Sequence, residues 1–191
     1  MKNDRQLDQA LAVRRRRRHL SRLELAIAVI VIGVLIGVLI ERADALMAQA
    51  EQTSVEQVEG QIRAAVGLAV AGRVAKGQLA AAAGLAASNP MNLLQTRPPN
   101  YLGAFDDPNP AQISPGHWYF DMRSGFLVYR VKHADAFETT LSGPARAEFT
   151  IRLRYRDADG DGRYDAGRDT LYGVDFIPVA PFRWTTNGSG R

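Results

Sequence analysis

Apolar residues follow three patterns along this chain of 191 residues, and each pattern predicts a different element. Every residue from Leu25 to Ile40 is apolar or glycine, which predicts a membrane-spanning helix about 24 Å long at about 1.5 Å per residue. From Glu41 to Val74 there is no proline and apolar residues recur every three or four positions, so the helix is expected to continue with one apolar face. After Gly116 apolar and polar residues tend to alternate, which predicts β-strands.

The amphipathic continuation is expected to press its apolar stripe against a partner surface and to turn most of its polar residues away. The stripe consists of Met47, Ala50, Ser54 or Val55, Val58, Ile62, Ala65 or Val66, and Ala69. The polar side is predicted to hold Glu51, Glu56, Glu59, Gln61 and Arg63. A membrane anchor followed by a coiled-coil stalk would produce a similar pattern.

The C-terminal half predicts four short strands. They are 118–120, 126–131, 149–155 and 171–179, with a hairpin turn at 123–125. A short alanine-rich helix is expected at 78–88. The predicted fold class is α+β, with a long N-terminal transmembrane and amphipathic helix packed on a small antiparallel β-sheet head. The predicted domains are a cytoplasmic basic segment 1–22, a transmembrane helix 23–40, its amphipathic continuation 41–75 and an α+β head 76–191.

Charge is distributed unevenly and predicts the orientation of the span. Residues 1–22 hold eight Lys or Arg against two Asp, whereas residues 41–191 hold sixteen against seventeen acidic residues. A basic flank stays in the cytoplasm, so the head is predicted to lie on the other side of the membrane. Nucleic-acid binding is not favoured, because the five arginines at 14–18 adjoin a membrane span and no aromatic residues are interleaved with them.

Glu24 lies at the edge of the apolar run, where a carboxylate needs a partner or a function. The basic segment, the stretch from Leu20 to Leu25 and the apolar helix after it resemble the N-terminus of type IV pilins and type II secretion pseudopilins. In that family a glutamate occupies the fifth position after the processing site. The resemblance implies that His19 ends the leader, that Leu20 is the first mature residue, and that Glu24 meets the N-terminal amine of a neighbouring subunit.

The resemblance also implies a prepilin peptidase, methylation of the new N-terminus, and other pilin or pseudopilin subunits as partners in the inner membrane. Histidine stands at position 19, where the family has glycine, and Arg22 lies where the family is apolar. An alternative for Glu24 is an interfacial ion pair with Arg22 or Arg18. Gly33 and Gly37 form a GxxxG pair that permits close helix packing.

Segments of the head resemble minor pilin-like proteins, including those of the MSHA-type pilus. These segments are NPMNLL (89–94), PPNYLG (98–103), WYFD (118–121) and the terminal PxxPFRW. Two other interpretations of the chain stay open. One is a permanently anchored periplasmic scaffold protein, and the other is a calcium-stabilised secreted domain released by signal peptidase at the Ala43-Asp44-Ala45 triplet.

Residues 157–169 (DADGDGRYDAGRD) predict a metal site. Carboxylates at relative positions 1, 3, 5 and 9, with glycine at 6, match most of an EF-hand calcium loop. The predicted ligands of Ca²⁺ are Asp157, Asp159, Asp161 and Asp165, with Arg163 contributing its carbonyl. Arg168 stands where a bidentate glutamate is expected. The alternative is a solvated hairpin loop, since Asp and Gly favour turns.

No combination of residues predicts catalysis. The three histidines show no metal-ligand spacing, no nucleophile or nucleotide motif occurs, and the chain has no cysteine. The sequence therefore predicts a non-catalytic protein.

Overall fold

The computed structural model describes residues 21–86 and 88–185. The chain divides into two units, Met1–Ala43 and Asp44–Arg191, and each is described by itself. The main element is helix α2 (Arg22–Ala75), whose 54 residues belong partly to one unit and partly to the other. The prediction of a long continuous helix is confirmed.

Helix α2 ends in a Schellman motif, a pair of hydrogen bonds that satisfies its last carbonyl groups. The Gln78 N–H donates to the Arg73 carbonyl at 2.8 Å, and the Gly77 N–H donates to the Val74 carbonyl at 2.9 Å. Gly77 has a φ of 69°, a conformation that glycine adopts without steric cost. The chain therefore reverses at Gly77 and runs back along the head.

Seven strands and four 3₁₀ helices follow α2 in the described part of the chain. The strands are β1 (Tyr101–Phe105), β2 (His117–Asp121), β3 (Phe126–Arg130), β4 (Phe137–Thr139), β5 (Arg146–Arg156), β6 (Thr170–Pro178) and β7 (Phe182–Trp184). The 3₁₀ helices are η2 (Leu79–Leu85), η3 (Pro90–Leu93), η4 (Pro110–Gln112) and η5 (Ala134–Ala136). The predicted strands correspond to β2, β3, β5 and β6, whereas β1, β4 and β7 were not predicted. The alanine-rich segment forms η2.

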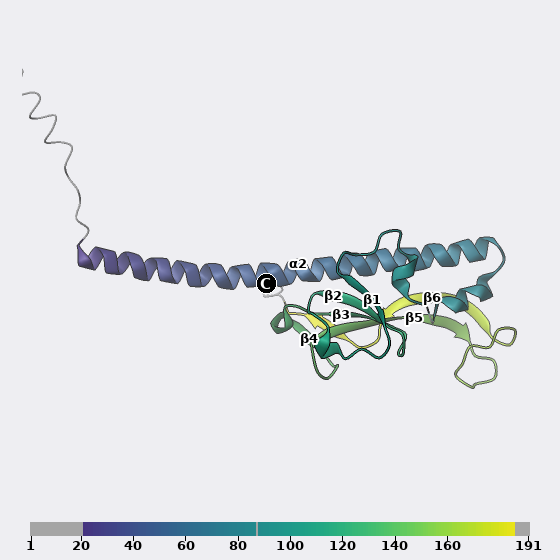
Figure 1. The fold of residues 1–191 in the computed structure, drawn as a ribbon. Helices are drawn as coiled ribbons and strands as arrows, with labels where there is room; N and C mark the ends of the chain where they lie inside the picture. Colours follow the sequence, from purple (N-terminus) through teal and green to yellow (C-terminus); the bar gives the residue numbers. More distant parts are fainter. Residues whose placement is uncertain (1–20, 87, 186–191) are drawn as a thin grey trace, which may run out of the picture. The chain divides into compact units, whose positions relative to one another are not determined.

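The main sheet has the strand order β1-β2-β3-β5-β6, and β4 pairs with β7 in a second, two-stranded sheet (Figure 1). All pairs are antiparallel except β1 with β2, which are parallel. The prediction of an antiparallel sheet is therefore wrong for this edge strand. The reason is the long connection from β1 to β2, which crosses back through η4 before β2 begins, as a parallel pair requires.

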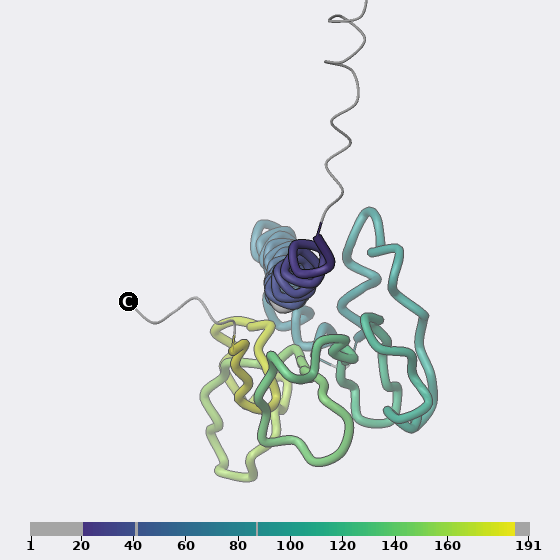
Figure 2. The backbone as a smooth tube through the Cα atoms, turned by 90° about the vertical axis from the view of Figure 1, so that its left-hand side faces the viewer, coloured from purple at the N-terminus to yellow at the C-terminus, as the bar shows by residue number. Residues whose placement is uncertain are grey.

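One face of the C-terminal half of α2 covers the sheet, and Figure 2 shows the strands on one side of this helical segment. The core joins Val55, Ile62 and Val66 of the helix to Trp118 and Phe149 of the sheet. All five side chains are buried almost completely. The partner surface expected for the amphipathic stripe is thus the sheet of the same head.

The predicted stripe needs two corrections at its N-terminal end. Met47 is 55% exposed and Ala50 is also exposed, whereas Ala48 and Glu51 face the head. Glu59 is buried as well. The prediction that Glu51 and Glu59 lie on the polar side is wrong: Glu51 accepts hydrogen bonds from the head, and Glu59 is buried beside Arg63 of the same helix.

Candidate functional site

Glu24 lies in the first turn of α2. Its backbone N–H donates to the Ser21 hydroxyl at 3.1 Å, and the Ser21 N–H donates to the Glu24 carboxylate at 2.8 Å. This reciprocal pair is a capping box, which satisfies two N–H groups at the start of the helix. The signal for it, Ser-x-x-Glu, was present in the sequence and was overlooked.

The capping box bears on the two interpretations of Glu24. Within the described residues, Glu24 makes no ion pair with Arg22. Arg18, His19 and Leu20 lie outside the described residues. The carboxylate therefore has a local role in starting the helix, and the predicted role in subunit assembly remains a prediction.

The apolar half of α2 is long and apolar enough to cross a membrane, by length and composition. Its side chains from Arg22 to Ile40 are all exposed in the isolated chain. A Cβ atom added at Gly33 or Gly37 would meet nothing within 4 Å. The GxxxG pair thus offers an open surface, as the prediction of helix packing requires.

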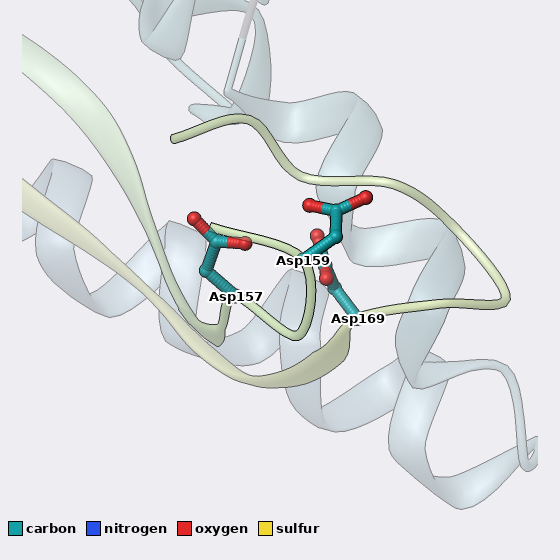
Figure 3. A group of neighbouring side chains, drawn as sticks. All are labelled: Asp157, Asp159 and Asp169. Atoms are coloured by element: carbon teal, nitrogen blue, oxygen red, sulfur yellow. The ribbon is translucent and has the colours of Figure 1, made fainter. Parts of the chain in front are cut away.

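The aspartate loop, residues 157–169, connects β5 to β6 and gathers carboxylates in two overlapping groups, the first of which is drawn in Figure 3. Asp157, Asp159 and Asp169 form one group, and Asp159, Asp161 and Asp165 form the other. Within each group, one oxygen of every carboxylate lies within 4.8 Å of the others. The four predicted aspartates therefore share one loop, but they do not form a single set of ligands.

Backbone N–H groups of the loop already hold several of these carboxylates. Asp157 accepts from the N–H groups of Gly160 at 2.6 Å and Gly162 at 2.8 Å. These backbone hydrogen bonds lower the pKa of Asp157, because they favour its charged form. The pKa of Asp165 is raised, first by desolvation and then by the negative charges of Asp161 and the other aspartates.

Asp169 is the member of the loop that sequence reasoning left out of the ligand set. It is buried, and its carboxylate accepts from the N–H groups of Ala158 at 3.0 Å and Asp165 at 2.7 Å. It lies one residue beyond the last ligand position of the EF-hand pattern, so a comparison of spacing does not include it. The carboxyl oxygens of the loop fit Ca²⁺, a hard cation that takes oxygen ligands.

The two arginines of the loop have other contacts. The Arg163 N–H donates to Asp161 at 2.8 Å, and the Arg168 guanidinium lies 3.3 Å from Asp159. No contact in the described residues tests whether the Arg163 carbonyl can serve as a ligand. Arg168 partly neutralises the loop at the position where an EF-hand has a glutamate.

A second, unpredicted site surrounds the carboxylate of Glu51. The Tyr129 hydroxyl and the Lys132 N–H donate to its Oε1 atom at 2.8 and 2.6 Å. The His133 N–H lies 2.9 Å and the His133 Nδ1 lies 2.6 Å from its Oε2 atom. The pKa of Tyr129 is raised, mainly because the phenol is buried and further because the Glu51 charge lies beside it. The sequence holds no local signal for this site, since its members are 78 to 82 positions apart.

No family model, curated protein or solved structure matches this chain. Its class therefore rests on the fold and the site: an α+β head built on a helix that is long and apolar enough to cross a membrane.

Proposed function

We propose that the protein is a non-catalytic, pilin-like subunit, of the minor kind, in a type IV pilus or a type II secretion pseudopilus. Before assembly it is anchored in the bacterial inner membrane by residues 23–40, with the head in the periplasm. Its partners are other pilin or pseudopilin subunits and a prepilin peptidase.

The observation that carries this proposal is the composition of α2. One continuous helix is apolar on all sides in its first half and buries a single face against a sheet in its second half. An ordinary anchor needs no helical continuity between span and head, since a loop would serve. A filament subunit benefits from it, because its apolar half can leave the lipid and pack among the same halves of other subunits.

Two rival functions differ from this one in how the N-terminus is processed. A permanently anchored scaffold keeps its first residue, and a secreted domain is cut after the Ala43–Ala45 triplet. That triplet lies inside α2. Signal peptidase would have to act on helical backbone there, which disfavours the secreted domain.

The test is the mature N-terminus, measured by intact mass and N-terminal peptide mapping of the protein from membranes. A start at Leu20, with or without N-methylation, supports the pilin-like function. A start at Met1 would contradict processing and leave the scaffold, whereas a start near Leu46 would identify a secreted domain.

We further propose that the aspartate loop binds Ca²⁺ and stabilises the β5–β6 hairpin of the head. Both carboxylate groups support this proposal, and so does the buried Asp169, which ties the two ends of the loop together. Bound Ca²⁺ would screen the mutual repulsion of the aspartates.

Thermal unfolding of the full chain in detergent micelles tests the calcium site. Excess Ca²⁺ should raise the melting temperature (Tm) relative to a chelator, as expected for a ligand that binds only the folded state. Mg²⁺ should have a smaller effect, because it demands a tighter octahedral geometry. An unchanged Tm would contradict the calcium site without affecting the pilin-like assignment.

A further inference from the structure

The carboxylate of Glu51 lies on helix α2, whereas all of its hydrogen-bond donors lie on another segment of the head. Each of its two oxygens accepts two hydrogen bonds, which fills the four acceptor positions that a carboxylate offers. All donors come from residues 129–133, at the end of β3 and in the segment after it. The Glu51 side chain is only 6% exposed, so these bonds replace nearly all of its hydration.

Two successive backbone N–H groups, of Lys132 and His133, point at the same carboxylate. Backbone groups aligned in this way form a concave anion site whose strength depends little on side-chain chemistry. The His133 imidazole and the Tyr129 hydroxyl complete it from both sides. An ionised carboxylate can only accept, so His133 bonds to it as a donor through an Nδ1–H group.

The segment that carries these donors is held in place by bonds that do not involve Glu51. The Val131 N–H donates to the Ala145 carbonyl at 3.0 Å, and the Ala136 N–H donates to the His133 carbonyl at 3.1 Å. The Thr185 N–H further donates to the Ala136 carbonyl at 2.8 Å. The ring of Tyr129 packs on Trp118 with the ring centroids 4.9 Å apart. The donors are therefore preorganised by the sheet.

We infer that Tyr129, Lys132 and His133 form a carboxylate-binding site on the head, and that Glu51 is its tethered ligand. The site recognises the carboxylate group and not the glutamate side chain as a whole. Any small carboxylate that reaches the four donors should bind there once the side chain of Glu51 is removed. The contact thus acts as a latch between α2 and the sheet.

Chemical rescue of Glu51→Ala tests this inference on the full chain in detergent micelles. The variant should melt at a lower temperature than the unaltered protein, and sodium formate should raise its Tm by at least about 3 °C. Sodium chloride at the same ionic strength should not. Glu51→Gln serves as the matched control, because its amide fills the space and leaves no room for formate.

The inference is wrong if formate and chloride act alike on Glu51→Ala, or if formate raises the Tm of Glu51→Gln equally. Should Glu51→Ala not fold, amide NMR of Glu51→Gln gives the answer instead. The Lys132 and His133 amide protons should both move upfield when the charged acceptor becomes neutral. If neither moves, Glu51 is not their partner and the site does not exist. Neither experiment depends on the pilin-like function.

Discussion

Two carboxylates of this chain bind backbone N–H groups in quite different ways. Asp157 accepts from Gly160 and Gly162, which lie three and five residues further along the same loop. Glu51 accepts from Lys132 and His133, about eighty residues away, and is buried on the face of α2 that packs against the head. The first arrangement follows from local sequence, whereas the second exists only once the head has folded.

The comparison shows where a charge contributes to stability. When an exposed loop carboxylate is removed, its former N–H donors can bond to water instead, so the free energy of unfolding changes little. A buried carboxylate leaves its donors without any partner when it is removed, and each such donor costs about 1–3 kcal/mol. The predictions below test this difference, starting with the largest effect.

Glu51→Ala should lower the free energy of unfolding by about 3–5 kcal/mol, because the buried Tyr129 hydroxyl and the partly buried donors of Lys132 and His133 all lose their partner. Chemical unfolding of the full chain in detergent micelles measures the change. Glu56→Ala is the matched control on the same helix, since Glu56 is exposed and, among the described residues, accepts a side-chain hydrogen bond from Gln52 alone. The control should stay within about 0.5 kcal/mol of the unaltered protein. Equal losses for both variants would show that the latch contributes nothing.

Tyr129→Phe should cost about 1.5–3 kcal/mol, since it removes one hydrogen bond to a charged group and keeps the aromatic ring. The ring contact with Trp118 should persist, so the loss reports on the hydroxyl alone. Tyr172→Phe, at a side chain that is 60% exposed on β6, provides the comparison and should be nearly neutral. Similar values for the two variants would contradict a donor role for Tyr129.

Asp169→Ala should cost about 1–2 kcal/mol even in the presence of a chelator. Its carboxylate is buried and accepts from two N–H groups, so its loss weakens the loop without any metal. Asp161→Ala should have almost no effect in chelator, because Asp161 is exposed. Each variant removes a carboxylate from one of the two groups, so each should reduce the calcium-dependent rise in Tm. A rise that survives undiminished in both would place the calcium elsewhere.

The sequence allowed good prediction wherever the physical cause was local or periodic. The unbroken apolar run and the 3.6-residue period predicted α2, and Arg123-Ser124-Gly125 correctly marked the β2–β3 turn. Residues 101–105 (YLGAF) gave no strand signal, because the segment does not alternate and Gly103 interrupts its register with β2. A parallel edge strand needs its neighbour to define it.

The candidate sites differ in the same way: those built from neighbouring residues could be predicted, and those built from distant residues could not. The aspartates of the loop were predictable because their spacing is short, yet Asp169 was missed because it acts across the base of the loop. The capping box of Ser21 and Glu24 could have been predicted from spacing alone. Glu51 could not, since a glutamate on an amphipathic helix is expected on its solvated side unless the fold supplies donors.

Glu59 sharpens the comparison, because it is a second buried glutamate on the same face with fewer donors. In the described part of the chain its carboxylate accepts only from Arg63, at 2.7 Å, and the Arg63 side chain is 53% exposed. Burial raises the pKa of Glu59 above its ordinary value of 4.5, although the Arg63 charge opposes the shift. Because Glu59 is buried with few donors, its ionised carboxylate slightly lowers the stability of the folded state.

The pH dependence follows from that direction. Between pH 4.5 and the raised pKa, the folded state binds more protons at Glu59 than the unfolded state does, so stability falls as pH rises through this window. Glu59→Gln should remove this part of the slope and leave the protein slightly more stable at neutral pH. Unfolding of the variant and of the unaltered protein, measured across this window, tests the sign. If stability falls more, or rises less, with pH in Glu59→Gln than in the unaltered protein, Arg63 outweighs burial and one exposed guanidinium is enough for this carboxylate.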